Sequence, residues 1–185
     1  NFSLIHDDIQ DSSLVRRSRP TVWALWGQNK AINAGDAMLA YAHLAMQGAN
    51  GLPEKTRLEA LQILDETCIA LTQGQHLDMT FEDQDVVTVE EYMTMISGKT
   101  ATLIATAAEL GALASGAPDE VRRSYRAFGH YLGLAFQIRD DLLGIWGDAL
   151  STGKSTTMDI ESGKKTLPIL HGLLHSPELR QAYRD

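Results

Sequence analysis

Closely spaced carboxylates are the side chains of this sequence with the clearest chemical potential. The first group is Asp7-Asp8-Ile-Gln-Asp11, in which Asp7 and Asp11 are four residues apart and so share one face of a helix. Like charges at that spacing repel, and cations that neutralise them make the arrangement stable. Carboxylate oxygens are hard ligands that suit Mg²⁺, which also binds oxygens of water and phosphate. The spacing therefore predicts a magnesium site, and the plainer interpretation is a solvated acidic helix face.

A second acidic pair, Asp140-Asp141, lies near the end of a strongly apolar segment. Two adjacent carboxylates among leucine, isoleucine and phenylalanine need cations or hydrogen-bond donors nearby, because unpaired buried charge is expensive. An ion pair with Arg139 is the plainer interpretation of this pair. Taken together, the two acidic groups predict a site in a helical bundle where Mg²⁺ ions hold a diphosphate.

A diphosphate also needs cationic donors, and several basic residues are available along the chain. Arg16 and Arg17 follow the first acidic group directly, and arginine offers paired donors to phosphate oxygens. Their plainer interpretation is a solvated loop or salt bridges to the neighbouring aspartates. Lys99 lies in an apolar helical stretch, where a lysine needs an anion as its partner. Lys154 follows a glycine but lacks the spacing of a nucleotide-binding P-loop, and Lys164 belongs to a further basic pair.

Composition narrows the class of protein further. The chain has 185 residues with 24 acidic and 16 basic side chains, and its net charge of −8 argues against a nucleic-acid-binding protein. Cys68 is the one cysteine, so a disulfide scaffold is excluded and a reducing, cytoplasmic location is expected. No apolar run approaches the roughly 20 residues that a membrane-spanning helix needs. Because the chain starts inside an apolar element, we expect the domain to continue before Asn1 and, less directly, after Asp185.

The elements that must position these residues follow from the apolar spacing and from the placement of Gly and Pro. Apolar residues recur at helical intervals through most of the chain, and no convincing strand pattern is present. Thr88 and Glu91 form a capping-box pattern at one helix start. The pattern predicts one all-α domain over residues 1–185, built as a bundle of long, mostly antiparallel helices. Helices are expected at 1–14, 28–47, 53–80, 88–114, 119–147 and 164–175, with a loop at 16–21 and a Gly/Ser/Thr-rich segment at 148–163.

In the order of these motifs the chain resembles the trans-isoprenyl diphosphate synthases, the polyprenyl synthetase family. The segment 3–11 is similar to the family's first aspartate-rich motif, and 136–141 is similar to the second. The resemblance covers nearly the whole chain and implies the isoprenoid synthase fold, with helices around a central apolar cavity. Further similar blocks are 16–21, 33–36, 74–78, 98–100, 152–154 and 159–168.

The resemblance implies a Mg²⁺-dependent condensation of isopentenyl diphosphate with an allylic diphosphate, carried out by a homodimer. Asp7, Asp11 and Asp140 would bind the metal, with Asp8 and Asp141 supporting them. The metal would stabilise the departing diphosphate as the allylic carbocation forms. The resemblance also implies that the allylic diphosphate is bound by Arg16, Lys99, Lys154 and Lys164, and that Arg17 binds isopentenyl diphosphate. Thr100 and Gln137 would lie close to the reacting carbons and, with Lys99, form the implied catalytic residues.

Two residues before the first acidic group bear on product length. Ser3 lies one helical turn before Asp7, and Phe2 lies beside it. The resemblance implies that residues below the first aspartate motif form the floor of the chain pocket, where the small Ser3 leaves room and the Phe2 ring closes the pocket deeper down. We expect a medium-chain product, geranylgeranyl diphosphate before farnesyl diphosphate. The plainer interpretation is that Phe2 is an ordinary core residue.

The sequence departs from the family pattern at Gly144, where a third aspartate usually ends the second motif, and two alternatives stay open. A class I terpene cyclase would share the first aspartate motif, but the second motif typical of cyclases does not follow Asp140. A non-catalytic subunit of a heteromeric synthase is supported by Gly144. The intact Asp7, Lys99 and Lys154 argue against that second alternative.

Overall fold

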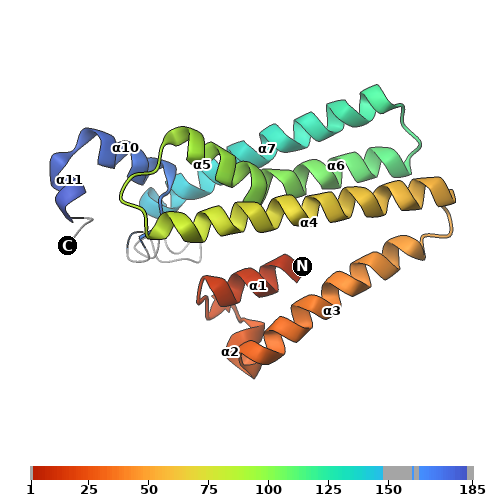
Figure 1. Ribbon diagram of the computed structural model, residues 1–185, viewed down its shortest axis with the longest axis horizontal. Coiled ribbons are helices and arrows are strands. Elements are labelled where there is room, and N and C mark those ends of the chain that lie inside the picture. Colours follow the sequence, from red (N-terminus) through yellow and green to blue (C-terminus); the bar gives the residue numbers. More distant parts are fainter. Residues whose placement is uncertain (1, 148–159, 161–162, 183–185) are drawn as a thin grey trace. The chain divides into compact units, whose positions relative to one another are not determined.

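The chain folds almost entirely into helices in the computed structural model, which describes residues 2–147, 160 and 163–182 (Figure 1). Within these residues the strands are limited to one antiparallel pair of 2 residues each, so the predicted all-α class is confirmed. No described helix combines the length and the apolar character needed to cross a membrane. The elements are α1 (Phe2–Gln10), β1 (Val15–Arg16), β2 (Arg19–Pro20), α2 (Val22–Trp26), α3 (Gln28–Gln47), α4 (Glu54–Glu82), α5 (Val89–Ile96), the π-helix η1 (Ser97–Ala101), α6 (Thr102–Ala114), α7 (Asp119–Trp146), α10 (Leu167–His175) and α11 (Pro177–Ala182).

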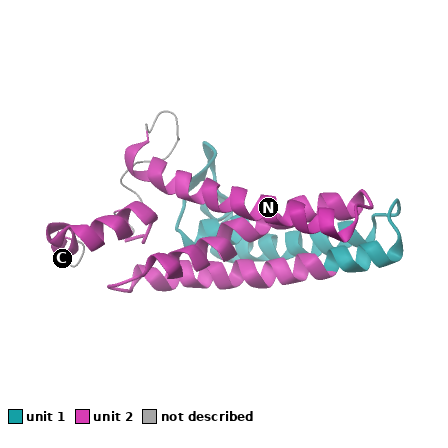
Figure 2. Cartoon of the chain, turned by 90° about the horizontal axis from the view of Figure 1, so that it is seen from above, with its two compact units in different colours: residues 1–61 teal, residues 62–185 magenta. Residues whose placement is uncertain are grey.

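Two compact units make up the chain, residues 1–61 and residues 62–185, and the division falls within α4 (Figure 2). In the first unit α1 and α2 pack against α3. In the second unit α6 packs along α7, η1 also contacts α7, and α10 contacts both α5 and α7. The prediction of one domain over 1–185 stays a prediction.

Helix boundaries match the sequence prediction where glycines flank a helix and differ where the backbone turns. α3 spans the predicted 28–47 between Gly27 and Gly48. α1 ends at Gln10 instead of residue 14, because Ser12 takes a left-handed φ of 51° that no helix can continue. α10 begins at Leu167, three residues later than predicted. The predicted segment 148–163 lies almost wholly outside the described residues.

A tight hairpin occupies the predicted loop after α1. Arg16 of β1 pairs with Arg19 of β2, which leaves Arg17 and Ser18 as a two-residue loop. Both loop residues have positive φ, 51° and 60°, as a type I′ turn requires. The hairpin reverses the chain directly after α1 and so returns Arg16 toward that helix.

α1 is seated on α3 through one close contact. The ring of His6 lies against Gly35, where an added Cβ would stand only 2.1 Å from His6 Nε2. His6 Nε2 is also 3.3 Å from the carbonyl oxygen of Ile32 and 3.4 Å from Asp36 Oδ1. Because only glycine leaves room for the imidazole there, Gly35 sets how closely α1, with its aspartates, approaches α3.

The core of the second unit is centred on α5. Tyr92 and Ile96 are its largest fully buried side chains. They pack with residues from three other places: the end of α4, the loop after it and the middle of α10. The buried members of this cluster are Phe81, Val87, Tyr92, Met95, Ile96 and Leu170. Burial of this set fixes α10 on α5 through the hydrophobic effect.

Two helix termini in the second unit are capped by hydrogen bonds. The predicted capping box at α5 is confirmed, since Glu91 N–H donates to Thr88 Oγ1 at 3.2 Å and Thr88 N–H donates to Glu91 Oε2 at 2.8 Å. At the end of α6, Gly116 has a φ of 74°, and Ala117 N–H donates to the carbonyl oxygen of Ala112 at 3.0 Å. That geometry is a Schellman stop. The capping box therefore fixes where α5 begins, and the Schellman geometry fixes where α6 ends.

The predicted helix 88–114 contains a turn that the sequence did not predict. η1 is a π-turn, in which Thr102 N–H donates to the carbonyl oxygen of Ser97. Such turns occur frequently at functional sites because the extra residue changes where neighbouring side chains point. Here the consecutive residues Lys99 and Thr100 contact different helices, α4 and α7.

Glycines let both neighbouring helices approach η1 at backbone distance. A Cβ on Gly74 of α4 would lie 2.1 Å from the backbone nitrogen of Lys99. A Cβ on Gly133 of α7 would lie 2.5 Å from the Cα of Ala101. Neither contact leaves space for a larger residue. The two glycines therefore hold α4 and α7 on η1 and fix the distance across which their side chains meet.

Candidate active site

In the first unit, the Arg16 guanidinium bridges two of the predicted metal-binding aspartates. Its Nε donates to Asp8 Oδ1 at 2.6 Å and its Nη2 donates to Asp7 Oδ2 at 2.8 Å. Asp8 is only 5% exposed, whereas Asp7 and Asp11 are half-buried. A buried carboxylate needs such a partner, because the loss of its hydration is otherwise not offset by any hydrogen bond. Asp8 is thus held by the protein itself, and the more accessible carboxylates are its neighbours.

The electrostatics of this bridge keep Arg16 charged. Burial alone would lower the pKa of the Arg16 guanidinium, but the hydrogen bonds and charges of Asp8 and Asp7 outweigh it and raise that pKa. The plainer interpretation of Arg16, a salt bridge to the neighbouring aspartates, therefore describes the structure. Its predicted contact with a diphosphate stays a prediction.

The other predicted residues of the first unit lie close by in sequence and differ in exposure. Arg17 is exposed at the tip of the hairpin. Phe2 and Ser3 are half-buried in the first turn of α1. Their predicted roles in substrate binding and product length stay predictions.

In the second unit, an aspartate joins two of the predicted substrate-binding lysines. Lys99 Nζ donates to Asp78 Oδ2 at 2.5 Å, and Lys164 Nζ lies 3.8 Å from the same oxygen. The anion that Lys99 was predicted to need is therefore present in the protein. Lysines from η1 and from the segment before α10 converge on one carboxylate of α4, which concentrates positive charge there. Lys154, predicted to share their role, lies outside the described residues.

A chain of hydrogen bonds joins the predicted catalytic residues Thr100 and Gln137 to the second acidic pair. Thr100 Oγ1 donates to Gln137 Oε1 at 2.6 Å, and Gln137 Nε2 donates to Asp141 Oδ1 at 2.8 Å. Asp141 Oδ2 accepts from the hydroxyl of Tyr92 at 2.7 Å and from the backbone N–H of Leu167 at 3.2 Å. The structure thus brings Thr100 and Gln137 together, and it adds two segments, α5 and α10, around the carboxylate of Asp141.

The acidic pair on α7 divides in the same way as the pair on α1. Asp141 is 5% exposed and has at least three donors from the protein, whereas Asp140 is half-buried. In each motif one aspartate is buried and an adjacent one is more accessible, and Asp7 also accepts from Arg16. This division separates candidate metal ligands from carboxylates with a supporting place in the fold.

Two residues with polar contacts in the second unit, Tyr92 and Asp78, were missed or undervalued by the sequence analysis. Tyr92 has the appearance of an ordinary core residue on an amphipathic helix, and nothing in its spacing indicates a polar partner. Burial raises the pKa of the Tyr92 hydroxyl, and the hydrogen bond and charge of Asp141 raise it further, so the group stays protonated and donates. Asp78 lies in the block 74–78 and was not among the predicted site residues.

A buried donor marks the same end of α4. Gln75 is 7% exposed, and its Nε2 has no hydrogen-bond partner among the described residues. A buried donor without a partner costs about 1–3 kcal/mol, and Gln75 lies about one helical turn before Asp78.

The residues present suit Mg²⁺ in kind. Asp7, Asp11 and Asp140 supply hard carboxylate oxygens at half-buried positions, which is the donor type that Mg²⁺ prefers. Within the described part of the chain, no cluster of three metal-binding side chains is present.

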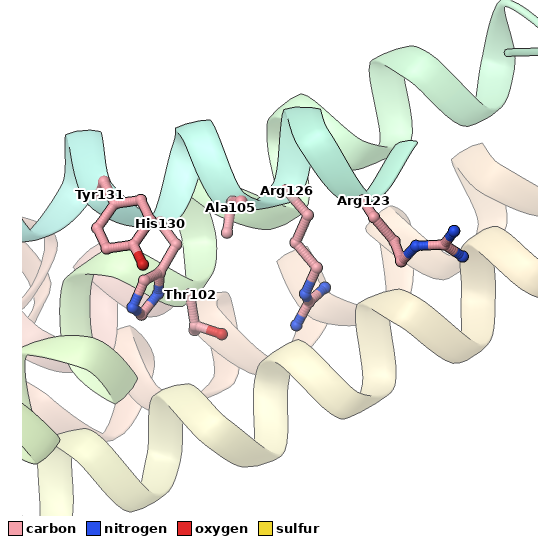
Figure 3. Close-up of a pocket in the computed structure, with 7 residues that line it drawn as sticks. Thr102, Ala105, Arg123, Arg126, His130 and Tyr131 are labelled. Carbon is pink, nitrogen blue, oxygen red and sulfur yellow. The ribbon is translucent and has the colours of Figure 1, made fainter. Parts of the chain in front are cut away.

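A separate pocket in the second unit contains none of the predicted site residues. It has a volume of about 260 Å³ and is lined by residues of α6 and α7, whose side chains project to the same side of the two helices (Figure 3). Arg123, Arg126 and His130 of α7 contribute its polar wall, and Arg126 is paired with Glu109. The pocket therefore lies apart from the network around Asp141.

Comparisons with known proteins give the family and the fold of the chain. The family model described as "Polyprenyl synthetase" matches residues 1–185. A (2E,6E)-farnesyl diphosphate synthase of Mycobacterium tuberculosis is 47% identical over 175 residues, covering 95% of this chain and 48% of that protein. A geranylgeranyl diphosphate synthase of the same organism is 44% identical over 173 residues, covering 94% of this chain and 49% of that protein. The crystal structure of a geranylgeranyl pyrophosphate synthetase from Pyrococcus horikoshii superposes with a TM-score of 0.90 at 38% identity, covering 98% of this chain and 56% of that one.

The helical fold and the two aspartate motifs thus define a class, the all-α isoprenyl synthases. The chain belongs to the polyprenyl synthetase family. It spans about half the length of the relatives it matches.

Proposed function

We propose that the protein is a Mg²⁺-dependent trans-prenyltransferase that condenses isopentenyl diphosphate with an allylic diphosphate. The observation that carries this proposal is that η1 presents two adjacent residues to different helices, Lys99 to Asp78 of α4 and Thr100 to Gln137 of α7. Gln137 in turn donates to Asp141 of the second acidic pair. In the reaction the allylic carbon loses its diphosphate and forms a bond with the double bond of isopentenyl diphosphate. A proton then leaves the new chain, with the released diphosphate as its acceptor.

We assign metal binding to the accessible carboxylates Asp7, Asp11 and Asp140, and a supporting role to Asp8 and Asp141. The division in exposure within each motif supports this assignment. When bound, Mg²⁺ neutralises charge that develops on the departing diphosphate. Hard oxygen donors at half-buried positions favour Mg²⁺ over softer metals.

Cationic side chains bind the diphosphates in this proposal. Lys99 and Lys164, which meet at Asp78, hold the allylic diphosphate together with Arg16 and Lys154. Arg17 contacts isopentenyl diphosphate from its exposed place in the hairpin. Thr100 and Gln137 lie close to the reacting carbons, where their oxygens face developing positive charge.

The product is a medium-chain all-trans prenyl diphosphate, with geranylgeranyl diphosphate favoured and farnesyl diphosphate next. Phe2 and Ser3 set its length from the turn of α1 that precedes Asp7. We expect Phe2→Ala to lengthen the product, because removal of the ring deepens the floor of the pocket. Chromatography of the dephosphorylated products measures this, with Tyr125→Phe, an exposed change on α7, as the control. An unchanged product would remove Phe2 from the floor.

The assembly and location form part of the same proposal. A homodimer is expected from the family, and the exposed apolar side chains of α3, namely Ile32, Met38, Tyr41 and Leu44, supply a surface for it. The single Cys68 is a free thiol and agrees with the cytoplasm as a reducing location.

The experiment that tests the proposal is chromatography of products from radiolabelled isopentenyl diphosphate, supplied with Mg²⁺ and with each allylic primer in turn. The proposal predicts a prenyl diphosphate longer than the primer. A hydrocarbon formed from geranylgeranyl diphosphate alone would favour the terpene cyclase. If the protein elongates nothing but stimulates a partner synthase, the non-catalytic subunit is the correct description.

A further inference from the structure

Tyr92 is a fully buried tyrosine whose hydroxyl has one carboxylate partner from another helix. Its exposure is 0%, and it lies in the core cluster with Phe81, Met95 and Ile96. The hydroxyl donates to Asp141 Oδ2 at 2.7 Å, which joins α5 to α7. A phenylalanine would fill the same volume, so the hydroxyl serves the hydrogen bond and not the packing.

The carboxylate of Asp141 determines which way the Gln137 amide faces. An ionised carboxylate only accepts hydrogen bonds, so the Gln137 group on Asp141 Oδ1 at 2.8 Å must be the NH₂. The amide oxygen then faces Thr100, 2.6 Å away, and Thr100 must donate its hydroxyl proton to it. The lone pairs of Thr100 Oγ1 are thereby left on the side away from Gln137.

The same carboxylate also fixes the start of α10. Leu167, the first residue of that helix, donates its backbone N–H to Asp141 Oδ2 at 3.2 Å. Lys164 lies three residues earlier and is 3.8 Å from Asp78. Loss of the anchor on Asp141 would therefore release both the Gln137 amide and the segment that carries Lys164.

We propose that Tyr92 and Asp141 are positioning residues, which fix the orientation of the Gln137 amide and, through it, the hydroxyl of Thr100. The inference rests on the proposed function, in which Gln137 and Thr100 lie close to the reacting carbons. Tyr92 restrains one oxygen of Asp141 by its hydroxyl, and the other oxygen restrains Gln137. Asp141 acts through these bonds and is not a ligand of the metal.

The first test is Tyr92→Phe, which removes one oxygen atom and keeps the ring. We expect kcat to fall about tenfold, which is typical when a residue that orients a functional group by a hydrogen bond is removed. The KM for both diphosphates should change less than the kcat, because Lys99 and Lys164 keep their contacts with Asp78. Tyr125→Phe is the matched control, since Tyr125 is an exposed tyrosine of α7, and it should retain full activity. An unchanged kcat in Tyr92→Phe would overturn the proposal.

A double-mutant cycle identifies the route of the effect. If Tyr92 acts through Gln137, Tyr92→Phe should lower kcat in the wild-type background and have little further effect in a Gln137→Ala background. Additive losses would show that Tyr92 acts elsewhere and would contradict the proposal.

Asp141→Asn separates positioning from metal binding. The asparagine retains the size of the side chain but replaces one acceptor by a donor. The side chain can then no longer accept from Gln137 on one side and from Tyr92 and Leu167 on the other. We expect a loss in kcat of at least tenfold with an unchanged Mg²⁺ concentration for half-maximal rate. A loss that excess Mg²⁺ restores would identify Asp141 as a metal ligand and overturn the assignment.

A readout without substrates separates this inference from the proposed function. In the NMR spectrum of the unliganded protein, the Gln137 side-chain amide should exchange slowly, and Tyr92→Phe should accelerate that exchange. If the wild-type protein elongates no substrate but the amide responds in this way, the network stands and the prenyltransferase proposal fails. If the amide already exchanges freely in the wild type, the positioning role is wrong.

Discussion

At the scale of single residues, the hairpin after α1 depends on a backbone conformation that its side chains disfavour. Arg17 and Ser18 both have positive φ, and neither is glycine. A left-handed backbone costs a residue other than glycine roughly 1–2 kcal/mol. The hairpin nevertheless forms and delivers Arg16 to Asp7 and Asp8. The two charge-assisted hydrogen bonds of Arg16 offset part of that cost.

We therefore expect Ser18→Gly to stabilise the protein by up to about 1 kcal/mol, because the relief of left-handed strain exceeds the added freedom of the unfolded chain. Urea unfolding followed by circular dichroism measures the change. Ser124→Gly is the matched control, since Ser124 lies in the second turn of α7 with a helical backbone, and it should lose about 0.5–1 kcal/mol. Equal destabilisation by both changes would contradict the strain at Ser18.

At the scale of elements, the packing of the second unit depends on glycines at helix contacts. Gly74 on α4 and Gly133 on α7 face the backbone of η1 and leave no room for a methyl group. Gly111 on α6 has no atom within 4 Å of the Cβ position and serves no such contact. Glycine is therefore required for packing at Gly74 and Gly133, whereas at Gly111 it only lowers the stability of the helix.

The contrast predicts opposite outcomes for one substitution. Gly74→Ala should destabilise the protein by about 1–3 kcal/mol or more, since the new methyl group meets the backbone of Lys99 and no side chain can move aside. Gly111→Ala should stabilise it by about 0.5–1 kcal/mol through helix propensity. Thermal unfolding of both variants provides the measurement. A stable Gly74→Ala protein would show that α4 and η1 do not pack at backbone distance.

Most helices follow from the sequence, and the details that build the site do not. The stripe of apolar residues and the breakers around α3 predict its bounds, and the capping box at Thr88 predicts the start of α5, because both are local signals. The π-turn at η1 is set by its packing between α4 and α7, which no local pattern encodes. For the same reason Tyr92 was missed, since its partner Asp141 is 49 residues away in sequence. The motif residues Lys99, Thr100 and Gln137 could be predicted, but not the hydrogen bonds that orient them.

At the scale of the whole molecule, the carboxylates of the two aspartate motifs differ in their burial. The buried Asp8 and Asp141 are held by donors of the protein, and the more accessible Asp7, Asp11 and Asp140 are proposed to bind Mg²⁺. A net charge of −8 favours the binding of divalent cations at such positions. The chain spans about half of its relatives' length.

The most direct measurement is the rate at which labelled isopentenyl diphosphate is added to an allylic primer with Mg²⁺, compared between wild type and Asp7→Ala. The account predicts elongation by the wild type and a loss of several orders of magnitude in the variant, with helicity by circular dichroism unchanged. Asp119→Ala, a change at an exposed aspartate in the first turn of α7, should retain the full rate. Equal turnover by Asp7→Ala and wild type would contradict the account, because the first aspartate motif would then take no part in the chemistry.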